Sequence, residues 1–102
     1  VAVLLPAEAS PAPLVEVLGR NEPRVVADFS GVAAWSGPAL LEVDSPLVRR
    51  VRSWLHRGEQ RLRVVLDLAV DPAHLLVTHT YESTPGGLRV LLVLRPIGPH
   101  QE

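Results

Sequence analysis

Arginine and aspartate recur at the same spacing in two places in the chain. Residues 24–29 read Arg-Val-Val-Ala-Asp-Phe, and residues 63–68 read Arg-Val-Val-Leu-Asp-Leu. In a β-strand, alternate side chains point to opposite faces, so each copy would place its Arg and Asp on one face and its larger apolar residues on the other. A guanidinium group can bind a carboxylate through two parallel hydrogen bonds. Each copy therefore predicts an outward charged face and an inward apolar face.

A third group of polar side chains lies between the two copies. Read as a strand, residues 47–57 place Val51 and Leu55 inward and Arg50, Arg52, Trp54 and His56 outward. Gly-Glu-Gln at 58–60 would then turn the chain directly into the second copy, so the outward residues would share a face with Arg63 and Asp67. A helix beginning near Asp44, Ser45 and Pro46 remains an alternative, because these residues suit a cap and a first turn. We favour the strand.

This outward face has a binding interpretation and a simpler one. Guanidinium groups suit carboxylates and Trp54 offers a flat ring, which together are typical of a binding surface. In the simpler interpretation, Arg63 and Asp67 belong to exposed cross-strand ion pairs that keep the sheet soluble and contribute about 0.2 to 1 kcal/mol each. Trp54 could equally pack at a sheet edge, and Trp35 is expected to plug a corner rather than to contact a ligand.

The residue types argue against catalysis. The chain has no Cys, which excludes disulfides and thiol chemistry, and its four His residues are scattered without a His-Glu-x-x-His motif. Nucleophile-elbow, phosphate-loop and dinucleotide motifs are also lacking. We predict no catalytic residue, no metal and no cofactor.

Composition indicates one globular domain. The 102 residues are 47% apolar and carry a formal net charge of −1, which gives no general attraction to nucleic acid. No apolar run approaches the ~18 residues of a membrane span, so we expect no membrane insertion. Because the chain begins with Val and contains no Met, we expect it to be a piece of a longer protein.

Frequent turn residues separate short apolar stretches, a pattern typical of an all-β sandwich with about seven strands. We expect two similar small sheets, related by the internal repeat and packed through their apolar faces. A Pro- and Ala-rich segment favours a linker before the domain. The expected divisions are a linker at 1–13, the sandwich domain at 14–96 and a tail at 97–102. The expected strands are 14–18, 24–30, 39–43, 47–57, 61–69, 75–81 and 88–94. The last two are expected to form a hairpin across Thr84-Pro85-Gly86-Gly87.

The order of these motifs resembles the AMIN domain. The resemblance is carried by Pro-Arg-Val-Val-x-Asp-Phe-Ser-Gly from Pro23, by Val-Arg-Arg-Val-Arg from Val48, and by Arg-Val-Val-Leu-Asp-Leu at 63–68, and it runs from about Leu14 to Arg95. AMIN domains accompany periplasmic N-acetylmuramoyl-L-alanine amidases and type IV pilus secretins. The resemblance implies a β-sandwich without catalysis of its own.

The resemblance also implies a function. We expect a periplasmic module that binds peptidoglycan and localises a fused amidase or envelope protein at the cell wall or division site. The alternative is a docking domain that binds a divisome, pilus or secretin protein. The predicted ligand-binding residues are Arg24, Asp28, Arg50, Arg52, Trp54, His56, Arg63 and Asp67.

Overall fold

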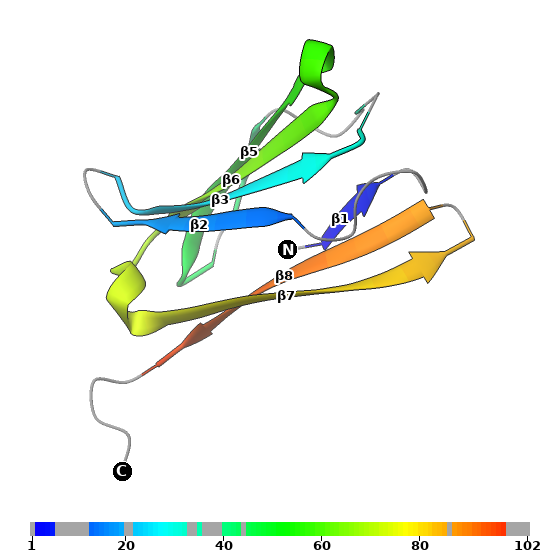
Figure 1. Ribbon diagram of the computed structural model, residues 1–102. Coiled ribbons are helices and arrows are strands. Elements are labelled where there is room, and N and C mark those ends of the chain that lie inside the picture. Colours follow the sequence, from blue (N-terminus) through cyan, green and yellow to red (C-terminus); the bar gives the residue numbers. More distant parts are fainter. Residues whose placement is uncertain are drawn as a thin grey trace.

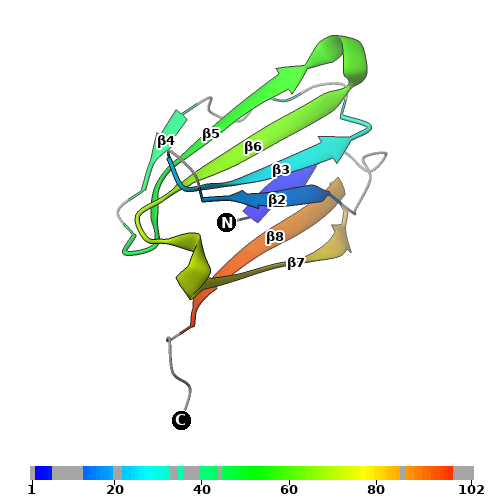
Figure 2. The same cartoon turned by 60° about the vertical axis from the view of Figure 1, so that its left-hand side comes forward.

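A computed structural model shows two layers of β-strands (Figure 1). It describes residues 2–5, 13–19, 22–32, 35, 40–43, 45–85 and 87–97. One layer is a five-stranded antiparallel sheet (Figure 2). From edge to edge, its strands are β2 (Leu14–Leu18), β3 (Arg24–Ser30), β6 (Arg61–Leu68), β5 (Val48–His56) and β4 (Leu40–Glu42).

The second layer is a three-stranded antiparallel sheet. Its strands, in order, are β1 (Ala2–Leu5), β8 (Gly87–Pro96) and β7 (Leu75–Thr84). Two 3₁₀ turns, η1 (Arg57–Glu59) and η2 (Pro72–His74), precede β6 and β7. The predicted all-β, two-sheet fold is therefore confirmed, and so is the hairpin expected near residues 84–87, since Thr84 pairs with Gly87.

The two copies of the repeat are neighbours in one sheet. We expected them in two similar sheets, and this was wrong: β3 and β6 pair antiparallel, with Arg24 opposite Asp67 and Asp28 opposite Arg63. Val26 lies opposite Val65, so a local two-fold axis perpendicular to the sheet passes between these residues and exchanges the copies. Antiparallel pairing of two strands with the same alternation turns both apolar faces to the same side, which forms one continuous core surface.

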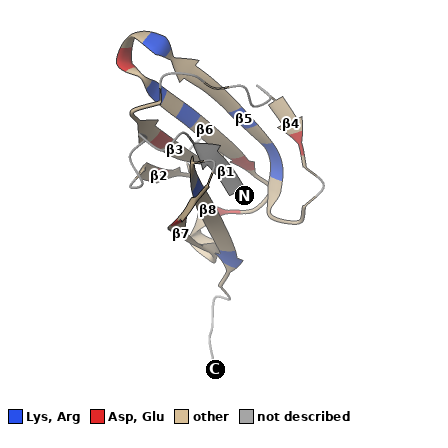
Figure 3. Ribbon diagram, turned by 90° about the vertical axis from the view of Figure 1, so that its right-hand side faces the viewer, with Lys and Arg blue, Asp and Glu red and all other residues tan. Residues whose placement is uncertain are grey.

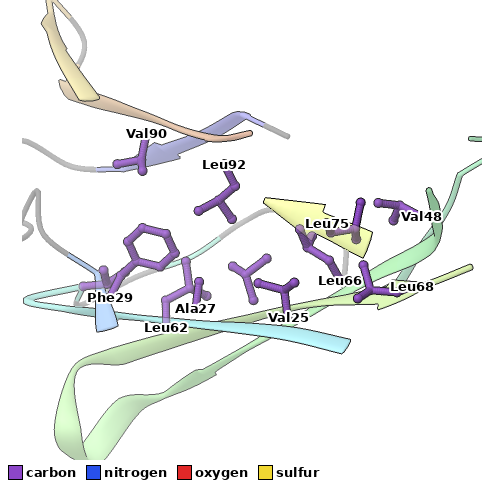
Figure 4. Close-up of a cluster of buried hydrophobic side chains, with 12 residues drawn as sticks. Val25, Ala27, Phe29, Val48, Leu62, Leu66, Leu68, Leu75, Val90 and Leu92 are labelled. Atoms are coloured by element: carbon purple, nitrogen blue, oxygen red, sulfur yellow. The ribbon is translucent and has the colours of Figure 1, made fainter. Parts of the chain in front are cut away.

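The core lies between the two layers (Figure 4). The inward residues of β3 and β6 include Phe29, Leu62 and Leu66, all fully buried, and they face Val90 and Leu92 of β8. Each such side chain stabilises the fold by about 1.5 to 3 kcal/mol through removal of apolar surface from water. Packing of the repeat strands against β8 thus fixes which face of the five-stranded sheet remains outward.

Residues 48–56 form a strand, which settles the choice between strand and helix. The pairing register shifts between Val48 and Arg50, where a bulge accommodates Arg49. Because side chains alternate, the extra residue allows Val48 and Val51 both to face the core while Arg50 and Arg52 both face outward. The bulge therefore keeps Val48 in the core, while Arg50 and Arg52 share the outer face through ordinary alternation.

The structure revises the expected N-terminal division. Ala2–Leu5 form β1 and pair with β8 from Ala2–Leu91 to Leu5–Leu88, so these four residues belong to the small sheet rather than to a linker. Residues 6–12 of the expected linker and 98–102 of the expected tail lie outside the described residues.

Gln60 connects η1 to β6 in a left-handed conformation, with φ of 50°. A side chain with a Cβ atom disfavours this region by roughly 1–2 kcal/mol, whereas glycine does not. Gln60→Gly is therefore expected to raise the free energy of unfolding by about 0.5 kcal/mol, after allowance for the greater freedom of unfolded glycine. Urea denaturation measures this change. Gln60→Ala, which keeps the Cβ, should show no gain, and equal effects of the two variants would contradict the argument.

Candidate functional site

Chemistry-bearing side chains collect on the outer face of the five-stranded sheet, the face turned away from β8. Figure 3 shows basic and acidic positions on the neighbouring strands β3, β6 and β5. Strand register places the side chains in rows across the sheet. The rows are Leu14–Asp28–Arg63–Trp54, then Glu16–Val26–Val65–Arg52, then Leu18–Arg24–Asp67–Arg50. Residues far apart in the sequence thus meet on one surface.

Asp67 lies at the centre of a three-residue ion cluster. Its Oδ2 accepts hydrogen bonds from Nε of Arg50 and Nε of Arg52, both at 2.8 Å, and its Oδ1 accepts a bond of 2.9 Å from Nη2 of Arg52. Burial alone would raise the pKa of Asp67, but these bonds outweigh burial and hold the pKa below its usual value. The residue is only 4% exposed. Asp67 therefore belongs to cross-strand ion pairs, as the simpler interpretation expects, but the long Arg side chains cover its carboxylate instead of leaving it exposed.

Asp28 and Arg63 form a second, two-pronged ion pair. Nε and Nη2 of Arg63 donate to the two carboxylate oxygens of Asp28 at 2.8 and 2.9 Å. The hydrogen bond from Arg63 lowers the pKa of Asp28, and the same bond raises the pKa of Arg63. This geometry fixes the plane of the Arg63 guanidinium. Nη1 is the one nitrogen of this group that does not bond to Asp28. In the same way, Nη1 is the one nitrogen of the Arg52 guanidinium that does not bond to Asp67.

The two tryptophans have different environments. Trp54 is 39% exposed on the outer face, so it is not a core residue. Its indole Nε1 donates to Nε2 of His56 at 2.8 Å, which orients the ring and requires that this histidine nitrogen carry no proton. Trp35 is half-buried against the core and donates from Nε1 to the Ser53 hydroxyl at 3.1 Å. Trp54 is thus the tryptophan available to a ligand.

A groove of about 450 Å³ runs over this face. Its floor contains Val26 and Val65, which sit on the local two-fold axis. The volume falls within the range of ligand sites, about 300 to 1,000 Å³. The complete lining is Glu16, Leu18, Glu22, Arg24, Val26, Arg52, Trp54, Arg63 and Val65.

Four predicted site residues line this groove directly: Arg24, Arg52, Trp54 and Arg63. The others support the lining residues, since Asp28 holds Arg63, Asp67 holds Arg52 and His56 holds Trp54. Arg50 instead lines a neighbouring hollow of about 260 Å³, together with Asp67 and Glu22.

Sequence reasoning missed Glu16 and Glu22, which contribute the acidic side of the groove. Glu16 could have been found from the β2–β3 hairpin, because the register that pairs Leu18 with Arg24 also pairs Glu16 with Val26 on the outer face. Glu22 lies outside any strand, so strand alternation carries no signal for it.

The two low carboxyl pKa values predict how stability depends on pH. A carboxyl whose pKa is lower in the folded state stabilises the fold fully above its unfolded pKa, and this contribution disappears as pH falls through the folded pKa. We therefore expect the stability gap between wild type and Asp28→Asn to be constant near neutrality and to close below about pH 4. Urea denaturation at several pH values measures the gap. A gap of constant size down to the lowest pH would contradict the prediction.

Comparison with known proteins adds no assignment: no protein-family model matches the chain, and no curated protein or solved structure matches it significantly. Within the described residues, no helix is long and apolar enough to cross a membrane. The same part of the chain contains no group of three His, Asp or Glu side chains arranged to hold a metal ion.

Proposed function

We propose that this chain is a non-catalytic module that binds peptidoglycan through the outer face of its five-stranded sheet. In this role it localises an amidase or another envelope protein to which it is fused, in the periplasm. The observation that carries the proposal is the groove over Val26 and Val65, where oriented guanidinium groups and an exposed indole surround an apolar floor.

Peptidoglycan presents the chemistry that this groove suits. Its stem peptides carry carboxylates and amides, which guanidinium nitrogens recognise, and its sugars have flat apolar faces that pack on aromatic rings. Arg52 and Arg63 are already held by Asp67 and Asp28, so little side-chain freedom is lost when a ligand binds. Trp54 lies in the same row as Arg63, beside the groove, where a sugar ring could stack on it.

The resemblance to AMIN domains supports the same function. The charged residues of each motif lie on the outer face, those of the first copy on β3, those of the second on β6, and Arg50 and Arg52 on β5. Motifs distant in the sequence therefore build one surface, as a shared binding role requires.

A non-catalytic role fits the protonation chemistry of the face. A general base needs a pKa near the working pH and a free lone pair aimed at its substrate. Asp28 and Asp67 have lowered pKa values, and their oxygens accept hydrogen bonds from arginine. These carboxylates act as anchors for guanidinium groups.

Docking to a pilus or secretin protein is the second candidate, and the sheet edges favour it. Within the described residues β2 and β4 are the outermost strands of the five-stranded sheet, and they expose Leu14, Leu40 and Leu41. An exposed edge strand can add a strand from another protein.

Co-sedimentation of the purified chain with peptidoglycan sacculi tests the proposal. We expect the chain to pellet with sacculi at low ionic strength and to be partly released by about 0.3 M NaCl, because exposed charges are screened by salt. A chain that stays in the supernatant at every salt concentration would overturn wall binding and favour docking to a protein.

A further inference from the structure

The groove carries charges of both signs. Arg24, Arg52 and Arg63 line it together with Glu16 and Glu22. Asp28 and Asp67 hold Arg63 and Arg52, and Arg50 shares Asp67 from the neighbouring hollow, so four positive groups balance four negative groups in and around the groove. A site for a simple anion would carry a net positive charge, and a site for a neutral sugar would not need charged walls. Balanced charges of both signs instead suit a ligand that is itself dipolar.

Glu16 and Arg52 stand on opposite sides of an apolar floor. Glu16, Val26, Val65 and Arg52 form one row across four strands. At a strand spacing of about 4.8 Å, the Cα atoms of Glu16 and Arg52 are roughly 14 Å apart. Both side chains line the groove together with the two valines. The floor can therefore contact a short aliphatic chain while the walls bind charged groups at its end.

The cationic side is prepared for a carboxylate. Arg52 and Arg63 each use Nε and Nη2 for their aspartates, so each directs its Nη1 group away from that bonded edge. A ligand carboxylate can therefore accept a hydrogen bond from either Nη1 group without breaking an ion pair. Arg24 contributes further positive charge, while its own Nη1 donates to the Glu22 carbonyl at 2.9 Å.

We infer that the groove binds a dipolar amino-acid group, with an ammonium and a carboxylate on one carbon, at the end of a short aliphatic chain. The carboxylate binds Arg52 and Arg63, the ammonium binds Glu16 and Glu22, and the aliphatic chain lies on Val26 and Val65. Within peptidoglycan, the free end of a diamino-dicarboxylic acid residue in the stem peptide has this chemistry. The inference rests on the proposed function, because it names the part of the wall that this site takes.

Titration calorimetry with three soluble peptides tests the inference on the full chain. The first is a stem tripeptide that ends in diaminopimelic acid, the second has lysine in that place and so lacks the side-chain carboxylate, and the third carries an acetylated side-chain amine. We expect the first peptide to bind about tenfold or more tightly than either analogue, since each analogue leaves one wall of the groove without its charged partner.

A matched pair of variants locates the ammonium site. Glu16→Gln should reduce the preference for the free over the acetylated peptide, because only Glu22 then remains for the ammonium, whereas Glu82→Gln, which removes the same charge from the small sheet, should keep the wild-type preference. Equal binding of all three peptides by wild type would overturn the inference, and so would absence of peptide binding by a chain that still pellets with sacculi. Either result would leave wall binding intact. Discrimination among the peptides without sedimentation would support the groove chemistry and overturn the proposed wall binding.

Discussion

Leu66→Asp is expected to abolish the folded state. Leu66 is fully buried on β6, and its side chain belongs to the core cluster that contacts β8. Loss of the buried leucine side chain costs about 2 to 5 kcal/mol of stability. Burial of a carboxylate in its place adds the cost of removing that charge from water. Together these terms approach or exceed the total stability of a domain of this size, about 5 to 15 kcal/mol. Circular dichroism and urea denaturation should show no cooperative unfolding transition.

Two further variants keep this expectation measurable. Leu66→Ala should fold but lose about 2 to 5 kcal/mol, because it leaves a cavity without burying a charge. Leu40→Asp makes the same chemical change at an exposed position on the edge strand β4, and it should alter stability by about 0.5 kcal/mol or less. A folded Leu66→Asp protein, or equal losses for Asp at 66 and at 40, would show that the inward assignment of β6 is wrong.

Removal of both arginines from Asp67 is expected to produce the second-largest loss. In Arg50→Met/Arg52→Met, the methionine side chains still cover the carboxylate but cannot donate hydrogen bonds. Asp67 then remains buried as an unpaired charge, which costs about 3 to 5 kcal/mol. Either single variant leaves one arginine on Asp67, so each should lose only about 1 kcal/mol. Urea denaturation of the three proteins measures these losses.

A compensating substitution separates this mechanism from general disruption of the strand. Adding Asp67→Leu to the double variant removes the buried charge and should restore most of the lost stability, because an apolar group of similar volume can replace a buried ion cluster. The account would be contradicted if the stability loss of the double variant equalled the sum of the two single losses and the triple variant recovered no stability.

Alternation of side chains was enough to predict much of the fold. The inward set of β6, with Leu66 and Leu68, and the outward Arg63 and Asp67 follow directly from the period of two that strands impose. Turn residues likewise marked the β7–β8 hairpin, because Pro and Gly at 85–87 interrupt two apolar runs.

Pairing between distant strands could not be predicted in the same way. The repeat shows that β3 and β6 have the same faces, but two similar strands can lie in separate sheets or side by side, and alternation is satisfied by both arrangements. The choice depends on the core shared with Val90 and Leu92. The bulge at Arg49 could not be predicted either. One extra residue in a strand changes which side chains face outward, but the amino-acid composition carries no sign of it.

Burial of Asp67 is a consequence of that pairing. Sequence alternation placed it outward, where an aspartate is ordinarily solvated, but register brings Arg50 and Arg52 over it from β5. Prediction of the groove would also have needed the register of β2 on β3, because that pairing places Glu16 on the same face.

Sedimentation of two matched double variants with peptidoglycan sacculi tests most directly whether the outer face binds the wall. Arg24→Gln/Trp54→Ala removes one cation and one aromatic ring from the groove while both aspartate ion pairs remain. Arg89→Gln/Tyr81→Ala removes the same kinds of group from exposed positions on the small sheet. We expect the first variant to lose most of its sedimentation and the second to pellet like wild type. Equal sedimentation of both variants, each verified as folded, would contradict wall binding through this face.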